Sequence, residues 1–243
     1  MFVKELFYAS VIGGSETETV VTLIDAGVDV NKRFLNSTAL VEASSKGHSI
    51  IASTLLNAGA DVDMPELIMG FTPLFKSCFN GQIACVRILL NSNASVNKVT
   101  NFGEIALHAA CAISPNHIEI INTLISSGSN VNKQNNVGQT PLYWACTNLG
   151  NELAIKTLIK YGADVRIADK YGILPIDIAY QNKDNIVVDI LNKEMRWLRR
   201  NPMILLKTIP SDLRRPISPL GLLLTDTSRR DSRDIIKEIA TYL

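Results

Sequence analysis

The stretch LLNAGADVD at residues 55–63 decides the fold, because variants of it return four more times along a chain of 243 residues. The other copies are LIDAGVDVN at 23–31, LLNSNASVN at 89–97, LISSGSNVN at 124–132 and LIKYGADVR at 158–166. Each copy places apolar residues before a glycine or an asparagine, residue types that can end a helix in the left-handed conformation. The stretch therefore predicts the end of a helix and a turn, repeated five times.

A second recurring phrase predicts another helix in each unit. Its copies are STALVEA at 37–43, FTPLFKS at 71–77, EIALHAA at 104–110, QTPLYWA at 139–145 and ILPIDIA at 173–179. Successive copies lie 34, 33, 35 and 34 positions apart, counted at Thr38, Thr72, Ile105, Thr140 and Leu174. Threonine caps a helix by accepting from an exposed amide, and proline is tolerated in the first turn. The regular period predicts a repeat protein with two helices, a glycine turn and a hairpin in each unit.

The TPL and GADV phrases resemble the signature of the ankyrin-repeat family, and they recur over residues 4–192. The resemblance implies an all-α ankyrin-repeat solenoid of stacked helix-turn-helix units with hairpin loops over residues 1–195, followed by a helical C-terminal extension at 196–243. The six expected units lie near 4–32, 36–64, 70–98, 103–133, 138–167 and 172–195. The first and last units depart from the pattern as capping repeats do, because each has a face without a neighbour.

Composition predicts a folded protein that stays inside the cell. The hydrophobic fraction is 47%, the charged fraction is 19%, and the net charge is +1. A near-neutral chain has no general attraction to nucleic acid or to anionic membranes, so neither is predicted as a partner. No apolar run reaches the roughly 18 residues of a membrane span, and Lys4 and Glu5 interrupt the N-terminus, which predicts no signal peptide. We expect a cytoplasmic protein, with the nucleus also open to it, that is monomeric by itself.

The histidines, cysteines and acids that could suggest catalysis occupy recurring positions in the repeat. His108 ends a TPLH-like phrase, where the histidine of the resembling family bonds to backbone, and His48 and His117 share a slot at the start of the second helix. Of the four cysteines, we expect Cys78 and Cys85 alone to approach each other, and a reduced thiol is favoured over a disulfide. Asp61 and Asp63 fall in the turns. We therefore predict no catalytic, cofactor-binding or metal-binding residues and no enzyme.

In the resembling family, the hairpin tips and the first helices line a concave face that binds a protein partner. The tip Leu67–Ile68–Met69 is apolar, and its hairpin is one residue longer than its neighbours, so we predict an interaction patch there. The alternative is that these side chains fold over the next helix or meet the tail. The predicted partner-binding residues are Phe34, Leu35, Lys46, Leu67, Ile68, Met69, Phe71, Phe79, Asn80, Phe102, Ile113, Thr147, Asn148 and Tyr171.

The period is lost from Met195, and residues 193–243 hold 11 Lys or Arg against 6 Asp or Glu. Three interpretations of this tail remain: a cap over the apolar end of the last unit, an adaptor segment faintly similar to F-box or SOCS-box tails, or a basic segment that touches membrane or nucleic acid. We accordingly predict an intracellular protein-interaction module or scaffold. The alternative is a substrate receptor of a ubiquitin ligase, in which the tail recruits the ligase.

Overall fold

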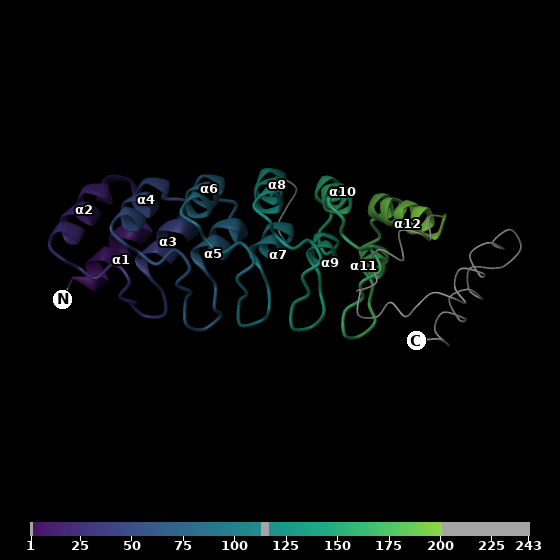
Figure 1. Cartoon of the computed structure of the whole chain (residues 1–243), viewed down its shortest axis with the longest axis horizontal. Helices are drawn as coiled ribbons and strands as arrows, with labels where there is room; N and C mark the ends of the chain where they lie inside the picture. Colours follow the sequence, from purple (N-terminus) through teal and green to yellow (C-terminus); the bar gives the residue numbers. More distant parts are fainter. Residues whose placement is uncertain (1, 113–116, 201–243) are drawn as a thin grey trace, which may run out of the picture. The chain divides into compact units, whose positions relative to one another are not determined.

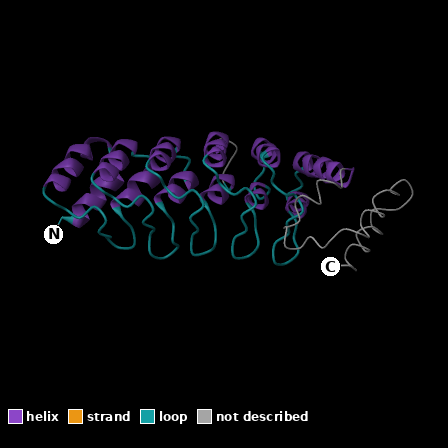
Figure 2. Ribbon diagram, in the orientation of Figure 1, coloured by secondary structure: helices purple, strands orange, loops and turns teal. Residues whose placement is uncertain are grey.

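The computed structural model describes residues 2–112 and 117–200, and the described part of the chain is helical (Figures 1 and 2). The first helices of the units are α1 (Val3–Ile12), α3 (Ala39–Lys46), α5 (Pro73–Phe79), α7 (Ala106–Cys111), α9 (Pro141–Ala145) and α11 (Pro175–Gln181). The second helices are α2 (Thr17–Asp25), α4 (Ser49–Asn57), α6 (Ile83–Asn91), α8 (Ile118–Ser126), α10 (Glu152–Lys160) and α12 (Asn185–Arg200), and a short 3-10 helix η1 (Gly14–Glu16) precedes α2. These bounds confirm the predicted all-α solenoid.

The helices of residues 1–191 stack in two layers. Each first helix packs on the first helix of the next unit, from α1 through α11, and the second helices pack in the same order from α2 through α10. Hairpins that project from the first-helix layer join consecutive units (Figure 1). Small residues let the first helices approach closely, and Ala43, Ala109 and Ala145 are all 0% exposed. The core is therefore a line of similar interfaces rather than one central cluster.

Threonine caps three of the first helices as the sequence predicts. The hydroxyls of Thr38, Thr72 and Thr140 accept from backbone amides three residues later, at 3.3, 3.1 and 3.2 Å. Two of the three units that lack this threonine, the fourth and the sixth, reverse the direction of the bond, whereas Phe2 before α1 makes no side-chain cap. The side chain of His108 accepts from the backbone N–H of Ile105 at 3.2 Å, and that of Asp177 accepts from the N–H of Leu174 at 2.8 Å. Each of these first helices thus receives a polar contact at its N-terminus.

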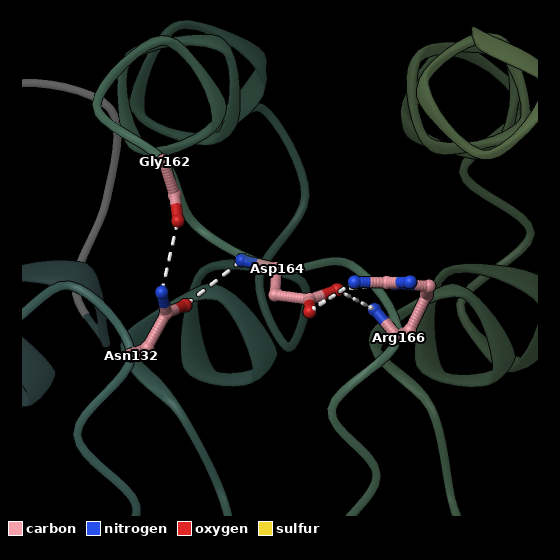
Figure 3. A network of polar contacts seen from close by, with 4 residues as sticks. All are labelled: Asn132, Gly162, Asp164 and Arg166. Carbon is pink, nitrogen blue, oxygen red and sulfur yellow. Dashed lines mark hydrogen bonds and ion pairs between the residues drawn. The ribbon is translucent and has the colours of Figure 1, made fainter. Parts of the chain in front are cut away.

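The turn acids hold the turns, as predicted, and three asparagines each tie their own turn to the turn of the next unit, as Figure 3 shows for Asn132. Asn132 donates to the carbonyl of Gly162 at 2.9 Å and accepts from the backbone N–H of Asp164 at 2.8 Å. Asp164 in turn accepts from the backbone N–H of Arg166 at 2.9 Å and forms an ion pair with its guanidinium at 2.7 Å. Asn31 and Asn97 repeat the bridge of Asn132. The second copy carries Asp63 in the asparagine position, where it accepts from the backbone N–H of Ser95, and the fifth copy carries Arg166.

The first hairpin is the shortest, and it forces a leucine into an unfavourable conformation. Phe34 and Ser37 pair through both backbone bonds, which leaves Leu35 and Asn36 as the two tip residues. Leu35 has φ 56°, in the left-handed region that costs a side-chain-bearing residue about 1–2 kcal/mol. Its side chain is 72% exposed, so no packing offsets this strain.

We expect Leu35→Gly to raise the free energy of unfolding by about 1 kcal/mol, because glycine adopts this conformation without the clash. Urea unfolding followed by circular dichroism measures the change. The matched control is Leu67→Gly, at an exposed tip residue that does not have positive φ. Glycine should be neutral or destabilising at residue 67, so the same gain at both positions would contradict a strain specific to Leu35.

The last described helix crosses the expected domain boundary. Helix α12 continues to Arg200, because residues 192–200 contain neither proline nor glycine and the first such residue is Pro202. The boundary predicted at 195 therefore falls inside a helix. The chain divides into two units between Leu191 and Asn192, and residues 201–243 lie outside the described residues. The interpretations of the tail remain predictions.

Candidate functional site

The hairpins between units, called here the fingers, are joined to one another at their tips. They comprise residues 31–37, 63–71, 97–104, 132–139 and 166–173, and they lie side by side along the first-helix layer (Figure 2). Backbone bonds run from Leu67 N to Asn36 O (2.9 Å), from Asn101 N to Met69 O (3.0 Å), from Asn136 N to Phe102 O (2.8 Å) and from Lys170 N to Val137 O (3.0 Å). The side chains of Asn101 and Asn136 add a second bond at two of these junctions. The tips therefore form a continuous, braced edge, which the sequence does not reveal.

Six predicted binding residues lie exposed along this edge, and we call them the apolar tip row. They are Leu35, Leu67, Ile68, Met69, Phe102 and Tyr171, with exposed fractions between 39% and 73%. Leu67, Ile68 and Met69 are 56%, 61% and 39% exposed, so the next helix does not cover these side chains. Exposed apolar side chains on fingers that are bonded to one another are typical of interaction surfaces.

Two aromatic residues of the predicted site support the fingers instead of standing free on them. Phe71 is half-buried and stacks on Phe75, with ring centroids 4.5 Å apart. Lys76 lies with its Nζ 5.4 Å from the Phe71 ring centroid and 3.6 Å from a carboxylate oxygen of Glu66. In the first finger, the ring centroid of Phe34 lies 5.3 Å from that of Phe7. These contacts pack the first two fingers against α1 and α5.

The predicted residues on the first helices also divide into two groups. Lys46, Phe79 and Thr147 are exposed. The amide of Asn80 donates to the Ser45 hydroxyl at 3.1 Å, and the amide of Asn148 donates to the carbonyl of Ala112. Both asparagines thus satisfy groups at the end of the preceding unit's first helix, a role that a comparison of equivalent positions between repeats could have found. Ile113 lies outside the described residues.

The shared slot of His48 and His117 is explained by packing. A Cβ atom on Gly13 would lie 2.2 Å from the His48 ring, and one on Gly81 would lie 2.4 Å from the His117 ring. The Nε2 atom of His48 is also 3.1 Å from the carbonyl oxygen of Val11. Each ring therefore fills the space over a glycine at the end of the preceding unit's first helix.

His108 bridges two units from a buried position. Its Nδ1 accepts from the backbone N–H of Ile105, and its Nε2 lies 3.1 Å from the carbonyl of Gln139. Burial lowers the pKa of His108 to about 4, whereas a histidine in an unfolded chain titrates near 6.5. The unfolded chain therefore takes up the proton first as the pH falls. The stability from His108 is complete above about pH 6.5 and is lost progressively toward pH 4.

We expect the free energy of unfolding to fall between pH 7 and pH 4.5 by about 2 kcal/mol more in the natural chain than in His108→Asn, because asparagine does not titrate. Asparagine keeps an acceptor for the Ile105 amide. Urea unfolding at both pH values measures the difference, in which the other titrating groups cancel. Equal slopes in the two proteins would show that His108 does not stay neutral in the folded state.

The four cysteines are buried, free thiols. Burial raises the pKa of Cys85 to about 11 and that of Cys146 to about 12, and it also raises the pKa of Cys78 and Cys111. Thiols held in the protonated form are poor nucleophiles and poor metal ligands. Within residues 2–112 and 117–200, no three His, Cys, Asp or Glu side chains converge on a point that could hold a metal ion. None of the helices in this part of the chain has the length and apolarity to span a membrane.

The sequence profile of ankyrin repeats matches the chain in three overlapping copies, at residues 6–100, 65–135 and 107–196. A protein of Escherichia coli strain K12 named as an ankyrin repeat protein, YahD, is 29% identical over 182 residues, which span 72% of this chain and 89% of YahD. Ankyrin repeat and SOCS box protein 5 of Oryctolagus cuniculus is 38% identical over 81 residues, 33% of this chain and 23% of that protein. The E3 ubiquitin-protein ligase XBAT33 of Arabidopsis thaliana is 31% identical over 94 residues, 38% of this chain and 18% of the ligase. Together with the stacked helix pairs, glycine turns and joined fingers, the profile match over most of the chain shows that it belongs to the ankyrin-repeat family.

Proposed function

We propose that the apolar tip row holds a protein partner, and that the chain acts by this binding rather than by catalysis. Ankyrin repeats are protein-interaction modules, and the carrying observation is the exposure of six apolar side chains on fingers that are bonded to one another. Binding is favoured when a partner removes surface leucine, isoleucine, methionine and aromatic side chains from water.

The bracing of the fingers supports a preformed surface. The backbone bonds at the four finger junctions hold the tips before a partner arrives. Ordering flexible loops on binding costs free energy, and a surface that is already ordered avoids much of that cost. Phe71, stacked on Phe75, holds the second finger in the same way. The tip row is therefore proposed to bind by complementarity of shape, with specificity in the residues at each tip.

The chain is proposed to work in the cytoplasm, because its four free thiols are typical of a protein in a reducing compartment. We further propose that the chain works as a monomeric scaffold and that nucleic acid is not its partner, in line with a net charge of +1. The ligase-receptor alternative depends on residues 196–243, and residues 201–243 lie outside the described part. Residues 196–200 continue a helix, so a truncation that tests this alternative should end after Arg200 rather than at 195.

Changing Leu67, Ile68 and Met69 together to serine is expected to weaken partner binding by about thirtyfold, the size of an interface hot spot of about 2 kcal/mol. The melting temperature should stay unchanged, because these side chains are exposed. Photo-crosslinking from residue 67 in cell extract identifies the bound protein, and its affinity for both chains is then measured by calorimetry.

The matched control changes Ile50, Leu153 and Ile186 to serine. These residues are also exposed and apolar, but they lie near the starts of the second helices, on the other layer. The control should retain full affinity. Equal loss of affinity in both triple variants would show that binding does not depend on the tip row, and a large drop in melting temperature in the first variant would show that its residues are core.

A further inference from the structure

The charges on the fingers indicate what kind of protein segment would fit beside the apolar tip row. The fingers contain six basic residues, Lys32, Arg33, Lys98, Lys133, Arg166 and Lys170, and four acidic ones, Asp63, Glu66, Glu104 and Asp169. The excess of two positive charges does not by itself identify a partner, because the net charge of a segment does not show which charges a partner can reach. The bonding of each group decides that question.

The acids of the fingers are engaged in the fold. Asp63 accepts from the backbone N–H of Ser95 at 3.0 Å, and Glu66 is paired with Lys76. Asp169 is 7% exposed and accepts from the amides of Tyr171 and Ile173 at 2.9 and 3.0 Å. Glu104 is half-buried, and burial raises the pKa of its carboxyl above the usual value. All four acids of the fingers are thus half-buried or buried, and three of them are bonded within the fold, which limits their access to a partner.

The arginines are engaged as well, which leaves lysines as the exposed charges. Arg33 is half-buried and donates to the carbonyl of Pro65 at 3.0 Å, and Arg166 forms its ion pair with Asp164. Lys32, Lys98 and Lys170 are exposed on the first, third and fifth fingers. They lie within four residues of Leu35, Phe102 and Tyr171 of the tip row, and the Lys170 ammonium lies 5.3 Å from the Tyr171 ring centroid.

We propose that the segment bound by the tip row is acidic, with aspartate or glutamate beside apolar side chains, so that lysines of the fingers face its carboxylates while the tips cover its apolar residues. This inference rests on the proposed function and specifies the partner's chemistry. A protein segment fits better than a nucleic acid, because four of the six tip-row side chains are aliphatic and give bases no ring to stack on, with rings only at Phe102 and Tyr171. The finger arginines Arg33 and Arg166 are also occupied.

The test selects peptide ligands from a random library, so the sequence of the ligand need not be known beforehand. A phage-displayed library of random peptides of about twelve residues is panned against the full chain, and enriched peptides are synthesised with a fluorescein label for anisotropy titrations. We expect the enriched peptides to carry net negative charge and apolar residues. Their affinity should fall about tenfold when Lys32, Lys98 and Lys170 are changed together to glutamate, since each exposed ion pair contributes a factor of about two to three.

The matched control changes Lys156, Lys160 and Lys193 to glutamate, which alters the net charge equally at exposed positions on α10 and α12. It should change the affinity by less than about twofold, since screening limits the reach of distant charges to about 10 Å. Equal losses in both variants would overturn the inference, because the effect would then come from net charge alone.

The remaining outcomes separate the inference from the proposed function. Enriched peptides that are neutral or basic, yet lose binding when Leu67, Ile68 and Met69 become serine, overturn the acidic partner and leave the tip row as a protein-binding surface. Failure to enrich any peptide that depends on these three residues overturns both. A fluorescein-labelled oligothymidine that binds the full chain as tightly as the best acidic peptide would overturn the inference in favour of a nucleic-acid ligand.

Discussion

Leu107→Ala is expected to lower the free energy of unfolding by about 3 kcal/mol. Leu107 is 0% exposed in α7, which packs against α5, α8 and α9. Alanine removes three carbon atoms from this junction and leaves a cavity that the surrounding helices fill only in part. Because each unit contacts only its neighbours, no distant contacts compensate for a weakened unit in the middle of the stack. Urea unfolding monitored by circular dichroism measures the loss.

The matched control for Leu107→Ala is the same substitution at Leu67, which is 56% exposed on the second finger. The control should change the free energy of unfolding by less than about 0.5 kcal/mol. A loss at Leu67 comparable to that at Leu107 would mean that the tip residues belong to the core, and it would remove the basis of the proposed binding surface. The pair of variants therefore tests the assignment of buried and exposed apolar residues in one measurement.

Gly138→Ala is expected to lower the free energy of unfolding by about 3 kcal/mol. Gly138 has φ 85°, a conformation in which a side chain costs about 1–2 kcal/mol. A Cβ atom there would also lie 2.8 Å from the backbone nitrogen of Lys170. That nitrogen donates to the carbonyl of Val137, so relief of the clash must shift the bond between the fourth and fifth fingers.

Gly162→Ala separates the two causes. Gly162 has a similar φ of 89°, and no atom lies within 4 Å of the Cβ that alanine would add. The free energy of unfolding of Gly162→Ala should fall only by the conformational cost, about 1–2 kcal/mol. Thermal and urea unfolding of both variants give the difference, which reports the close approach of adjacent fingers. Equal losses would show that the joined tips contribute little to stability.

Much of the local structure was predictable because it depends on neighbours in the sequence. Gly59, Gly128 and Gly162 adopt left-handed conformations, and Asn93 replaces glycine in the third copy with φ 64°. Thr72 and Thr140 cap their helices, as their places before proline predict. The turn role of Asp61 is confirmed by its bond to the backbone N–H of Asp63 at 2.9 Å. Each of these outcomes depends on bonds that span a few residues.

The exposure of the predicted binding residues was harder to predict from the sequence, because the position of a residue in the repeat does not determine which groups its side chain contacts. Phe34 and Phe71 occupy finger positions like those of exposed residues, yet each packs against other rings. Asn148 occupies the slot of Asn80, and both amides bond to the preceding unit. The binding role of the remaining residues is a proposal, supported by their exposure along a braced edge.

The sequence by itself determined the period, the helix ends, the caps and the turn residues, because each follows from the conformational preferences of a few consecutive residues. Only the tertiary structure decided which apolar finger residues are exposed, which charges are engaged and how the finger tips join. Those features depend on contacts between residues about one repeat apart, such as Leu67 with Asn36 and Lys170 with Val137. A residue's type states what it can bond to, whereas the stacking of the next unit settles whether that partner comes within reach.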